Sequence, residues 1–315
     1  MTVLLQVNEL HKAYGAVTIL DSATASFADD QKIGVIGRNG AGKSTLLKLF
    51  TGLIWPTAGH VRICGHDVNY AHRQAMSHVG AIIEWPAFIP DLSARCNLNI
   101  LSGGHGAEYE KKLEHIIEFV ELKDRLHDKV GLFSTGMKQR LGIALALLPD
   151  SKFIILDEPT NGLDPAGIVE IRTIIKEYNR RFGTTILITS HLLTEIETVC
   201  SRLAVIKDGK IVAFGTLDEL LSKENTVKVV ADDFDLAVAL LRRARQEGSL
   251  PVLSVVCEKP EILLRVSGEC AAAVNAMLVT NGLKVSHLSQ ERKKLESFFM
   301  EATGYGQEHV ERDLV

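Results

Sequence analysis

The fold is decided by the segment Gly37-Arg38-Asn39-Gly40-Ala41-Gly42-Lys43-Ser44-Thr45. It matches the pattern G-x-x-x-x-G-K-[ST], in which glycines let the backbone curl and point successive N–H groups inward. A helix that starts at about Lys43 would add partial positive charge and unpaired N–H groups. We expect Lys43 to reach the outer phosphates of a nucleotide and the Ser44 hydroxyl to ligate magnesium. The segment therefore predicts a phosphate-binding loop.

The residues on either side of this loop fit a strand and a helix. Lys32 to Ile36 is a short apolar run, typical of a buried strand, and Ser44 to Phe50 carries enough leucine for a helix packed on a sheet. A glycine-rich turn without a ligand is the alternative. A chance match to the pattern in a chain of this length is on the order of one in a hundred, and the flanks lower it further. The prediction is an α/β phosphate-loop NTPase core.

Two adjacent carboxylates follow a second apolar run. Phe153 to Leu156 predicts a buried strand, and Asp157 and Glu158 come directly after it. Successive side chains on a strand point to opposite faces, so the two acids can take different roles. We expect Asp157 to hold magnesium through water and Glu158 to polarise the attacking water. A solvated acidic turn before Pro159 would be the better interpretation if the phosphate loop were missing.

A third apolar run ends at a histidine. Thr184 to Ser190 predicts a buried strand, and His191 follows it. Most isolated histidines are structural. The carboxyl ends of strands in open α/β sheets, however, are where ligands bind. His191 is therefore expected to hydrogen-bond the γ-phosphate and to orient the water.

Together these segments resemble the nucleotide-binding subunit of ABC transporters over about residues 3–220. Gly37–Thr45 is similar to Walker A, Phe153–Glu158 to Walker B, Asn161–Asp164 to the D-loop, and His191 to the switch histidine. The resemblance implies that Tyr14 stacks on adenine, although a partly buried structural aromatic is the alternative. It also places Asp164 of the D-loop among the nucleotide-site residues.

The segment between the two strands resembles the family signature Leu-Ser-Gly-Gly-Gln, but here reads Phe133-Ser134-Thr135-Gly136-Met137. Ser134 is placed to cap a helix from about Lys138 to Leu148. The resemblance implies that this helix start, with Ser134 and Gly136, faces the γ-phosphate held by a second subunit. Two copies of the chain, or this chain and a close relative, would then clamp ATP between them. Thr135 and Met137 depart from the family pattern and would make closure slower or looser.

A second departure lies where the family has glutamine between the core and the helical subdomain. Here the residue is Glu84. Glu84, together with the segment from Ser134 to Leu148, resembles the bacitracin- and lantibiotic-resistance type of exporter ATPase. A carboxylate can touch magnesium or its water, but it cannot donate an N–H as an amide does. A surface acid at a strand end is the alternative.

The composition is that of a globular protein. The chain has 315 residues, 46% hydrophobic and 23% charged, and its net charge of −4 gives no electrostatic case for binding nucleic acid. Its apolar stretches are too short for a membrane span, and no signal peptide is evident. Five scattered cysteines without C-x-x-C indicate reduced thiols. We expect a cytoplasmic protein, held at the cytoplasmic face of the membrane by a permease.

The periodicity predicts two domains. Residues 1–221 would form the ATPase domain, with a β-rich first part to about residue 83 and a helical subdomain at about 85–148. Alternation of Val3, Leu5 and Val7 with their neighbours predicts a half-buried strand. A helix from Glu108 to Leu122 would place Leu113, Ile116, Ile117 and Val120 on one face, and Ile168 to Phe182 predicts a further helix.

A boundary falls near Leu221 to Asn225. Residues 226–305 show a β-α-β-β-α-β pattern, the ferredoxin-like order, followed by a tail at 306–315. This α+β domain is expected to pack or dimerise.

Two functions remain open from the sequence. The first is an energy-coupling ATPase that drives separately encoded membrane subunits, with export of a peptide antibiotic, a lipid or a similar compound. The alternative is a soluble ABC-type ATPase that acts on ribosomes or DNA; one phosphate loop and no sustained heptads argue against it. A phosphate-loop kinase would leave the segment from Ser134 to Arg140 unexplained.

Overall fold

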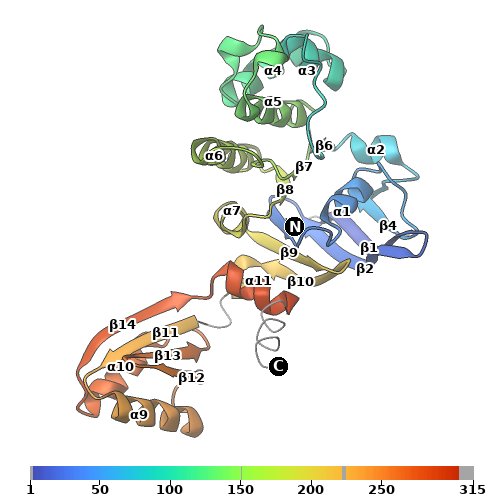
Figure 1. The fold of residues 1–315 in the computed structure, drawn as a ribbon. Helices are drawn as coiled ribbons and strands as arrows, with labels where there is room; N and C mark the ends of the chain where they lie inside the picture. Colours follow the sequence, from blue (N-terminus) through green and yellow to red (C-terminus); the bar gives the residue numbers. More distant parts are fainter. Residues whose placement is uncertain (1–2, 150, 222–224, 305–315) are drawn as a thin grey trace. The chain divides into compact units, whose positions relative to one another are not determined.

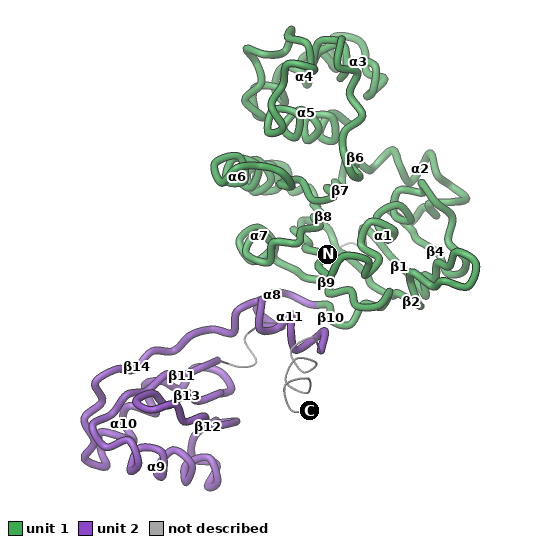
Figure 2. Tube along the Cα trace, viewed as in Figure 1, with its two compact units in different colours: residues 1–214 green, residues 215–315 purple. Residues whose placement is uncertain are grey.

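The computed structural model describes residues 3–149, 151–221 and 225–304. The chain divides into two compact units, residues 1–214 and residues 215–315 (Figure 2). Helix α8 (Leu217–Leu221), which the sequence placed in the ATPase domain, belongs to the second unit, where it contacts α11 (Leu295–Thr303). The expected tail at 306–315 and most of the expected boundary, residues 222–224, lie outside the described residues.

The first unit is built on a six-stranded sheet in the order β10-β9-β3-β8-β7-β6 (Figure 1). Strands β6, β7, β8, β3 and β9 run parallel. Their carboxyl ends therefore share one edge, where the loops after β3, β7 and β8 meet. The strands are β3 (Lys32–Ile36), β6 (Val79–Ile82), β7 (Phe153–Asp157), β8 (Thr185–Thr189), β9 (Arg202–Lys207) and β10 (Lys210–Thr216). The three apolar runs that predicted buried strands are thus β3, β7 and β8.

A second sheet, in the order β2-β1-β4-β5, forms the β-rich part. Its strands are antiparallel: β1 (Val3–Tyr14), β2 (Val17–Ala28), β4 (Ala58–Ile63) and β5 (His66–Asp67). The predicted burial of alternate residues holds for Leu5 and Val7 but fails at Val3, which is exposed, and at Leu4, which is buried. The pairing of β1 with β2 shifts register between Val3 and Leu5, which explains the change of face.

Four helices flank the two sheets: α1 (Lys43–Phe50), α2 (His72–Met76), α6 (Pro165–Phe182) and α7 (Leu193–Val199). Helix α1 contacts β2 and β7, α6 contacts β8, and α7 contacts β3. Helix α6 begins three residues earlier than Ile168, the start expected from the sequence. Asp164 accepts the Gly167 N–H as the N-cap, and Pro165 occupies the first turn.

The helical subdomain contains α3 (Ala94–Ser102), α4 (Ala107–Phe119) and α5 (Thr135–Leu147), with short 3-10 turns at Lys123–Arg125 and Val130–Leu132. Helix α4 buries Leu113, Ile116 and Ile117, the face that the sequence predicted. Helix α5 starts at Thr135 rather than at about Lys138, because Ser134 caps it. It packs closely on β6: a Cβ at Gly80 would lie 1.9 Å from the Ala146 carbonyl oxygen.

The second unit has the β-α-β-β-α-β order expected from the sequence. Its elements are β11 (Asn225–Ala231), α9 (Phe234–Glu247), β12 (Val252–Glu258), β13 (Glu261–Val266), α10 (Ala271–Thr280) and β14 (Val285–Arg292). The sheet runs β12-β13-β11-β14, with the β11–β13, β11–β14 and β12–β13 pairs antiparallel. Its own core gathers Val227, Leu241, Leu264 and Val274. In the described part of the chain, every helix is too short or too polar to span a bilayer.

One buried amide anchors the loop between Glu84 and α3. Asn97 is 0% exposed; its Oδ1 accepts the Ile89 N–H at 2.7 Å, and its Nδ2 donates to the carbonyls of Ile89 and Ser93, each at 3.0 Å. The side chain thus satisfies both backbone groups of Ile89. Leucine has a similar volume but cannot make these bonds. The Ile89 N–H would then lose the acceptor that Asn97 supplies, and the carbonyls of Ile89 and Ser93 would keep only their backbone donors, the N–H groups of Leu92 and Asn97.

We therefore expect Asn97→Leu to lower the free energy of unfolding of the first unit by roughly 2 kcal/mol. Urea denaturation followed by tryptophan fluorescence measures this change, because both tryptophans, Trp55 and Trp85, lie in that unit. Asn281→Leu, at an exposed position in the second unit, is the matched control. Equal urea midpoints for Asn97→Leu and wild type would contradict the anchoring role.

Candidate nucleotide site

The phosphate loop joins β3 to α1 and holds its lysine inward. Gly40 and Gly42 have φ of 82° and 106°, conformations that residues with a Cβ rarely adopt. Lys43 is only 7% exposed, and its ammonium donates to the carbonyl oxygens of Gly37 at 2.7 Å and Arg38 at 3.2 Å. Ser44 is exposed at the start of α1. The loop thus encloses the Lys43 ammonium and leaves the Ser44 side chain exposed where α1 begins.

The charge of Lys43 is set by two opposing effects. Burial lowers the pKa of its ammonium, and the nearby carboxylates of Glu158 and Asp157 raise it. The carboxylates at the end of β7 therefore lie close enough to Lys43, after β3, for their charges to interact with its ammonium. The structure therefore brings together the lysine and both acids that the sequence singled out.

The two carboxylates have separate partners, as their alternation on a strand predicts. Asp157 is buried, and its Oδ1 accepts the Thr189 hydroxyl at 2.5 Å. The same hydroxyl oxygen accepts the backbone N–H of Glu158 at 2.9 Å. Glu158 has a φ of 46°, so the chain turns sharply there. Its Oε2 lies 3.2 Å from Nδ1 of His191, which follows β8.

Glu84 lies at the end of β6 and is paired with a cation. Its Oε1 accepts a hydrogen bond from the Lys48 ammonium at 2.7 Å, and this bond raises the pKa of Lys48, against the opposing effect of burial. Lys48 lies on α1, one turn beyond Ser44. The carboxylate therefore sits beside the helix that follows the phosphate loop, in an ion pair that is mostly exposed to solvent.

Tyr14 ends β1 and is exposed. The Lys12 ammonium lies 4.6 Å from the centroid of its ring, and it also donates to the Trp55 carbonyl at 2.8 Å. An exposed ring of this kind can stack on a planar base. The contacts of Tyr14 are thus those of a surface aromatic rather than of a core residue.

The signature and D-loop residues cap their own helices. Ser134 accepts the Met137 N–H at 3.2 Å, and Asp164 accepts the Gly167 N–H at 2.8 Å. The two segments are neighbours: a Cβ at Gly136 would lie 3.8 Å from the Leu163 side chain. Both helix starts are therefore formed and open within a single chain.

Sequence reasoning missed the hydroxyls that hold the site together. Thr189 pairs with Asp157 in the β7–β8 register and bridges both acids through its side chain. Its signal was its place at the end of a strand next to the carboxylates. Ser190 and Thr160, both buried, reach the carboxylate of Glu195 at 2.9 and 2.6 Å. Nothing in the linear pattern connects those three residues.

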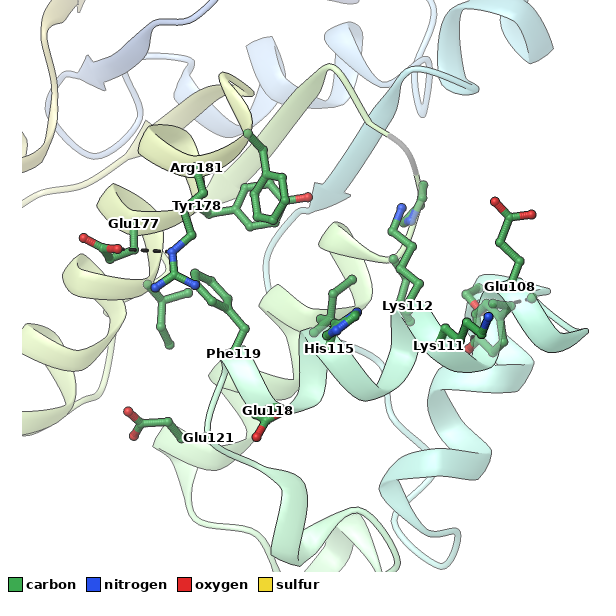
Figure 3. Close-up of a pocket in the computed structure, with 18 of the residues that line it drawn as sticks. Glu108, Lys111, Lys112, His115, Glu118, Phe119, Glu121, Glu177, Tyr178 and Arg181 are labelled. Carbon is green, nitrogen blue, oxygen red and sulfur yellow. Dashed lines mark hydrogen bonds and ion pairs between the residues drawn. The ribbon is translucent and has the colours of Figure 1, made fainter.

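A groove of about 1460 Å³ lies elsewhere in the first unit, between α4 and α6. Figure 3 shows His115 and charged side chains of both signs around it, among them Lys112, Glu118 and the pair of Glu177 with Arg181, whose Oε2 and Nε atoms lie 3.3 Å apart. None of the nucleotide-site residues predicted from the sequence lines it. It is therefore separate from the site at the strand ends.

Comparisons with known proteins agree with this geometry. The family model for the ABC transporter matches residues 20–161. The bacitracin transport ATP-binding protein BcrA of Bacillus licheniformis is 32% identical over 97% of this chain and 99% of its own length. The lantibiotic transport ATP-binding protein SrtF of Streptococcus pyogenes is 39% identical over 66% of this chain and 89% of its own.

A solved structure of an ATP-binding subunit of an ABC transporter is 32% identical and matches with a TM-score of 0.63, over 69% of this chain and 91% of that one. These matches agree with the geometry of the site, which brings the phosphate loop, the paired acids and the histidine to one edge of the sheet. The chain therefore belongs to the ABC transporter family, as an ATP-binding subunit that hydrolyses ATP.

Proposed function

We propose that this chain powers an exporter whose membrane-spanning permease is a separate polypeptide, and that the cargo is a peptide antibiotic, a lipid or a similar amphipathic compound. The observation that carries this proposal is the likeness to BcrA over nearly the whole length of both chains, including the second unit. The name of that relative states bacitracin transport, and the name of SrtF states lantibiotic transport.

The phosphate loop would hold the triphosphate. Its backbone N–H groups and the start of α1 face the anion, and Lys43 would exchange its two carbonyl partners for the outer phosphate oxygens. The Ser44 hydroxyl and the Asp157 carboxylate are oxygen donors of the kind that suit Mg²⁺, which usually keeps several waters and binds through few protein ligands. Bound there, Mg²⁺ would neutralise charge on the phosphates; Glu84 is the further candidate ligand.

Glu158 and His191 would handle the water. Glu158 accepts a proton from the water that attacks the γ-phosphorus, and the bond to the β–γ bridging oxygen breaks to give ADP and phosphate. His191 lies 3.2 Å from Glu158 and would hydrogen-bond the γ-phosphate while it orients that carboxylate. The Thr189 hydroxyl fixes the backbone of Glu158, so the carboxylate starts from a defined position.

A second ATPase chain would complete the site. Ser134 caps the start of α5, where the first N–H groups of a helix lack partners within it, and among the described residues outside this helix start only Leu163 lies within 4 Å of a Cβ at Gly136. That helix start would close on the γ-phosphate held by the partner, with Asp164 at the rim and Tyr14 stacked on adenine. ATP would then sit between two chains, and its hydrolysis would let them separate.

Ser134→Arg tests this pairing, because a long cation at the helix start would block closure without touching the phosphate loop. In a Glu158→Gln background saturated with MgATP, we expect a dimer by light scattering, and a monomer when Ser134→Arg is added. The monomeric double variant should bind ATP within about twofold of the Glu158→Gln protein, because the phosphate loop of the same chain supplies the binding energy. Dimerisation of the Ser134→Arg variant would contradict the role given to this helix start.

Exposed aromatic and apolar side chains in the loops after α1, before α2 and after β6 support a permease-binding surface. Leu53, Trp55 and Tyr70 are exposed in the loops after α1 and before α2, and the Trp55 and Tyr70 rings lie 5.8 Å apart. Trp85 is exposed directly after Glu84. Aromatic side chains of this kind are enriched in protein–protein contacts. A short helix of the permease would dock there and pass closure of the ATPase pair to the membrane.

Co-expression with a candidate permease of the bacitracin- or lantibiotic-export type tests the export proposal. We expect cells that carry both proteins to tolerate more bacitracin or lantibiotic than cells that carry the Glu158→Gln variant with the same permease. Unchanged sensitivity to every such compound, with intact ATPase activity, would overturn the cargo class. The likenesses to transport subunits do not favour the alternative of an ATPase that acts on ribosomes or DNA.

A further inference from the structure

A buried carboxylate on α7 joins the two strand ends that carry Glu158 and His191. Glu195 is 4% exposed, and its Oε2 accepts two hydrogen bonds, from the Thr160 hydroxyl at 2.6 Å and from the Ser190 hydroxyl at 2.9 Å. Thr160 comes two residues after Glu158, and Ser190 directly precedes His191. One oxygen atom thus ties the segment after β7 to the segment after β8.

The Ser190 hydroxyl also fixes the backbone on the far side of His191. It accepts the Leu192 N–H at 3.0 Å while it donates to Glu195, so the chain is held on both sides of the histidine. The Glu195 N–H in turn donates to the Leu192 carbonyl at 3.0 Å. The His191 side chain is exposed between these two held residues, and its Nδ1 lies 3.2 Å from Glu158 Oε2.

The other side of the carboxylate faces the helix that follows the D-loop. Arg172 on α6 places Nη2 3.9 Å from Glu195 Oε1. Thr160 opens the turn into the D-loop, and its carbonyl accepts the Leu163 N–H at 3.2 Å. Glu195 therefore contacts three segments at once: the turn before Asn161, helix α6, and the residue before His191.

We propose that Glu195 is a positioning residue for ATP hydrolysis: it clamps Thr160 and Ser190 so that His191 stays in register with Glu158, and it passes movements of the D-loop segment to His191. The inference rests on the proposed roles of Glu158 and His191. Charge-assisted bonds to a buried carboxylate are strong and directional, and small displacements of catalytic groups are costly to rate. In this role Glu195 acts through Thr160, Ser190 and His191 rather than on the nucleotide directly.

Steady-state and single-turnover ATPase assays on the full chain test the clamp. We expect Glu195→Ala to lower kcat by roughly 10- to 100-fold, while the Kd for ATP stays within about twofold. Glu195→Gln should recover most of kcat, because the amide oxygen can still accept both hydroxyls. An equal loss for Glu195→Gln and Glu195→Ala, or a parallel loss of ATP affinity, would overturn the proposal.

The decisive measurement is the double variant with His191→Ala. If Glu195 acts through His191, Glu195→Ala should add little to the loss already caused by His191→Ala. If the two single losses in kcat multiply in the double variant, Glu195 does not act through His191, and the proposal for Glu195 is overturned while the role of His191 stands. A wild-type kcat for His191→Ala would instead overturn the proposed role of His191, and the clamp with it.

Two milder variants keep the test valid if Glu195→Ala fails to fold. Thr160→Val and Ser190→Ala each remove one hydroxyl and leave the rest of the packing in place. Each should lower kcat with unchanged ATP affinity, and each should be non-additive with His191→Ala. Wild-type kcat for both variants would overturn the clamp.

Discussion

Glu158→Gln is expected to bind ATP with near-normal affinity and to hydrolyse it about 10²- to 10⁴-fold more slowly than the wild type. Glutamine keeps the shape and one acceptor oxygen, so it can still contact His191 and the attacking water. It cannot take the proton that the water must lose as the bond to phosphorus forms. Binding energy comes from Lys43 and the loop backbone, which the change leaves untouched. ATP-bound closed dimers should therefore accumulate.

Single-turnover hydrolysis and light scattering with MgATP measure the two effects. Glu118→Gln is the matched control, because Glu118 lies on α4 in an exposed ion pair with Lys123. The control should hydrolyse at the wild-type rate and stay in the wild-type monomer–dimer equilibrium. If Glu158→Gln also turned over at that rate, another group would have to activate the water. If it stayed monomeric with ATP bound, the pairing of identical copies would be wrong.

The strands and the phosphate loop were predictable from sequence because their signals are local. An apolar run of four or five residues, followed at once by polar residues, marks a buried parallel strand that ends at a site. Such runs located β3, β7 and β8, and the parallel order of the sheet then brings their ends together. A local signal also gave the cap Ser134, whereas the cap Asp164 was not predicted, and α5 and α6 both start about three residues before the expected positions.

The supporting hydroxyls were not predictable, because their partners are far apart in the chain. Thr189 meets Asp157 across 32 positions, and Thr160 meets Glu195 across 35. Serine and threonine at strand ends are common, and only the strand register decides which carboxylate each one reaches. The ion pair of Lys48 with Glu84 was unpredictable for the same reason, because α1 and the end of β6 come together only when the sheet forms.

Lys43→Ala is expected to abolish tight ATP binding. The ammonium lies inside the phosphate loop, where it bonds to the carbonyls of Gly37 and Arg38. Burial lowers the pKa of Lys43, which means that its positive charge is poorly stabilised inside the loop. Bound phosphate oxygens would replace the neutral carbonyl acceptors with charged ones and so stabilise that charge. Loss of the charge should weaken binding by about 1.5–3 kcal/mol, which is roughly a 10- to 150-fold increase in Kd.

The Lys43→Ala substitution should also leave the negative charges at the strand ends without a compensating cation. With alanine at position 43, the Asp157 and Glu158 carboxylates would face the triphosphate without the cation that now offsets them, so the loss in affinity should grow as salt is lowered. Isothermal titration with ATP at two ionic strengths measures both parts. Lys111→Ala, which removes the same charge from an exposed position on α4, is the control and should bind as the wild type does. An unchanged Kd for Lys43→Ala would show that the curled backbone alone holds the nucleotide.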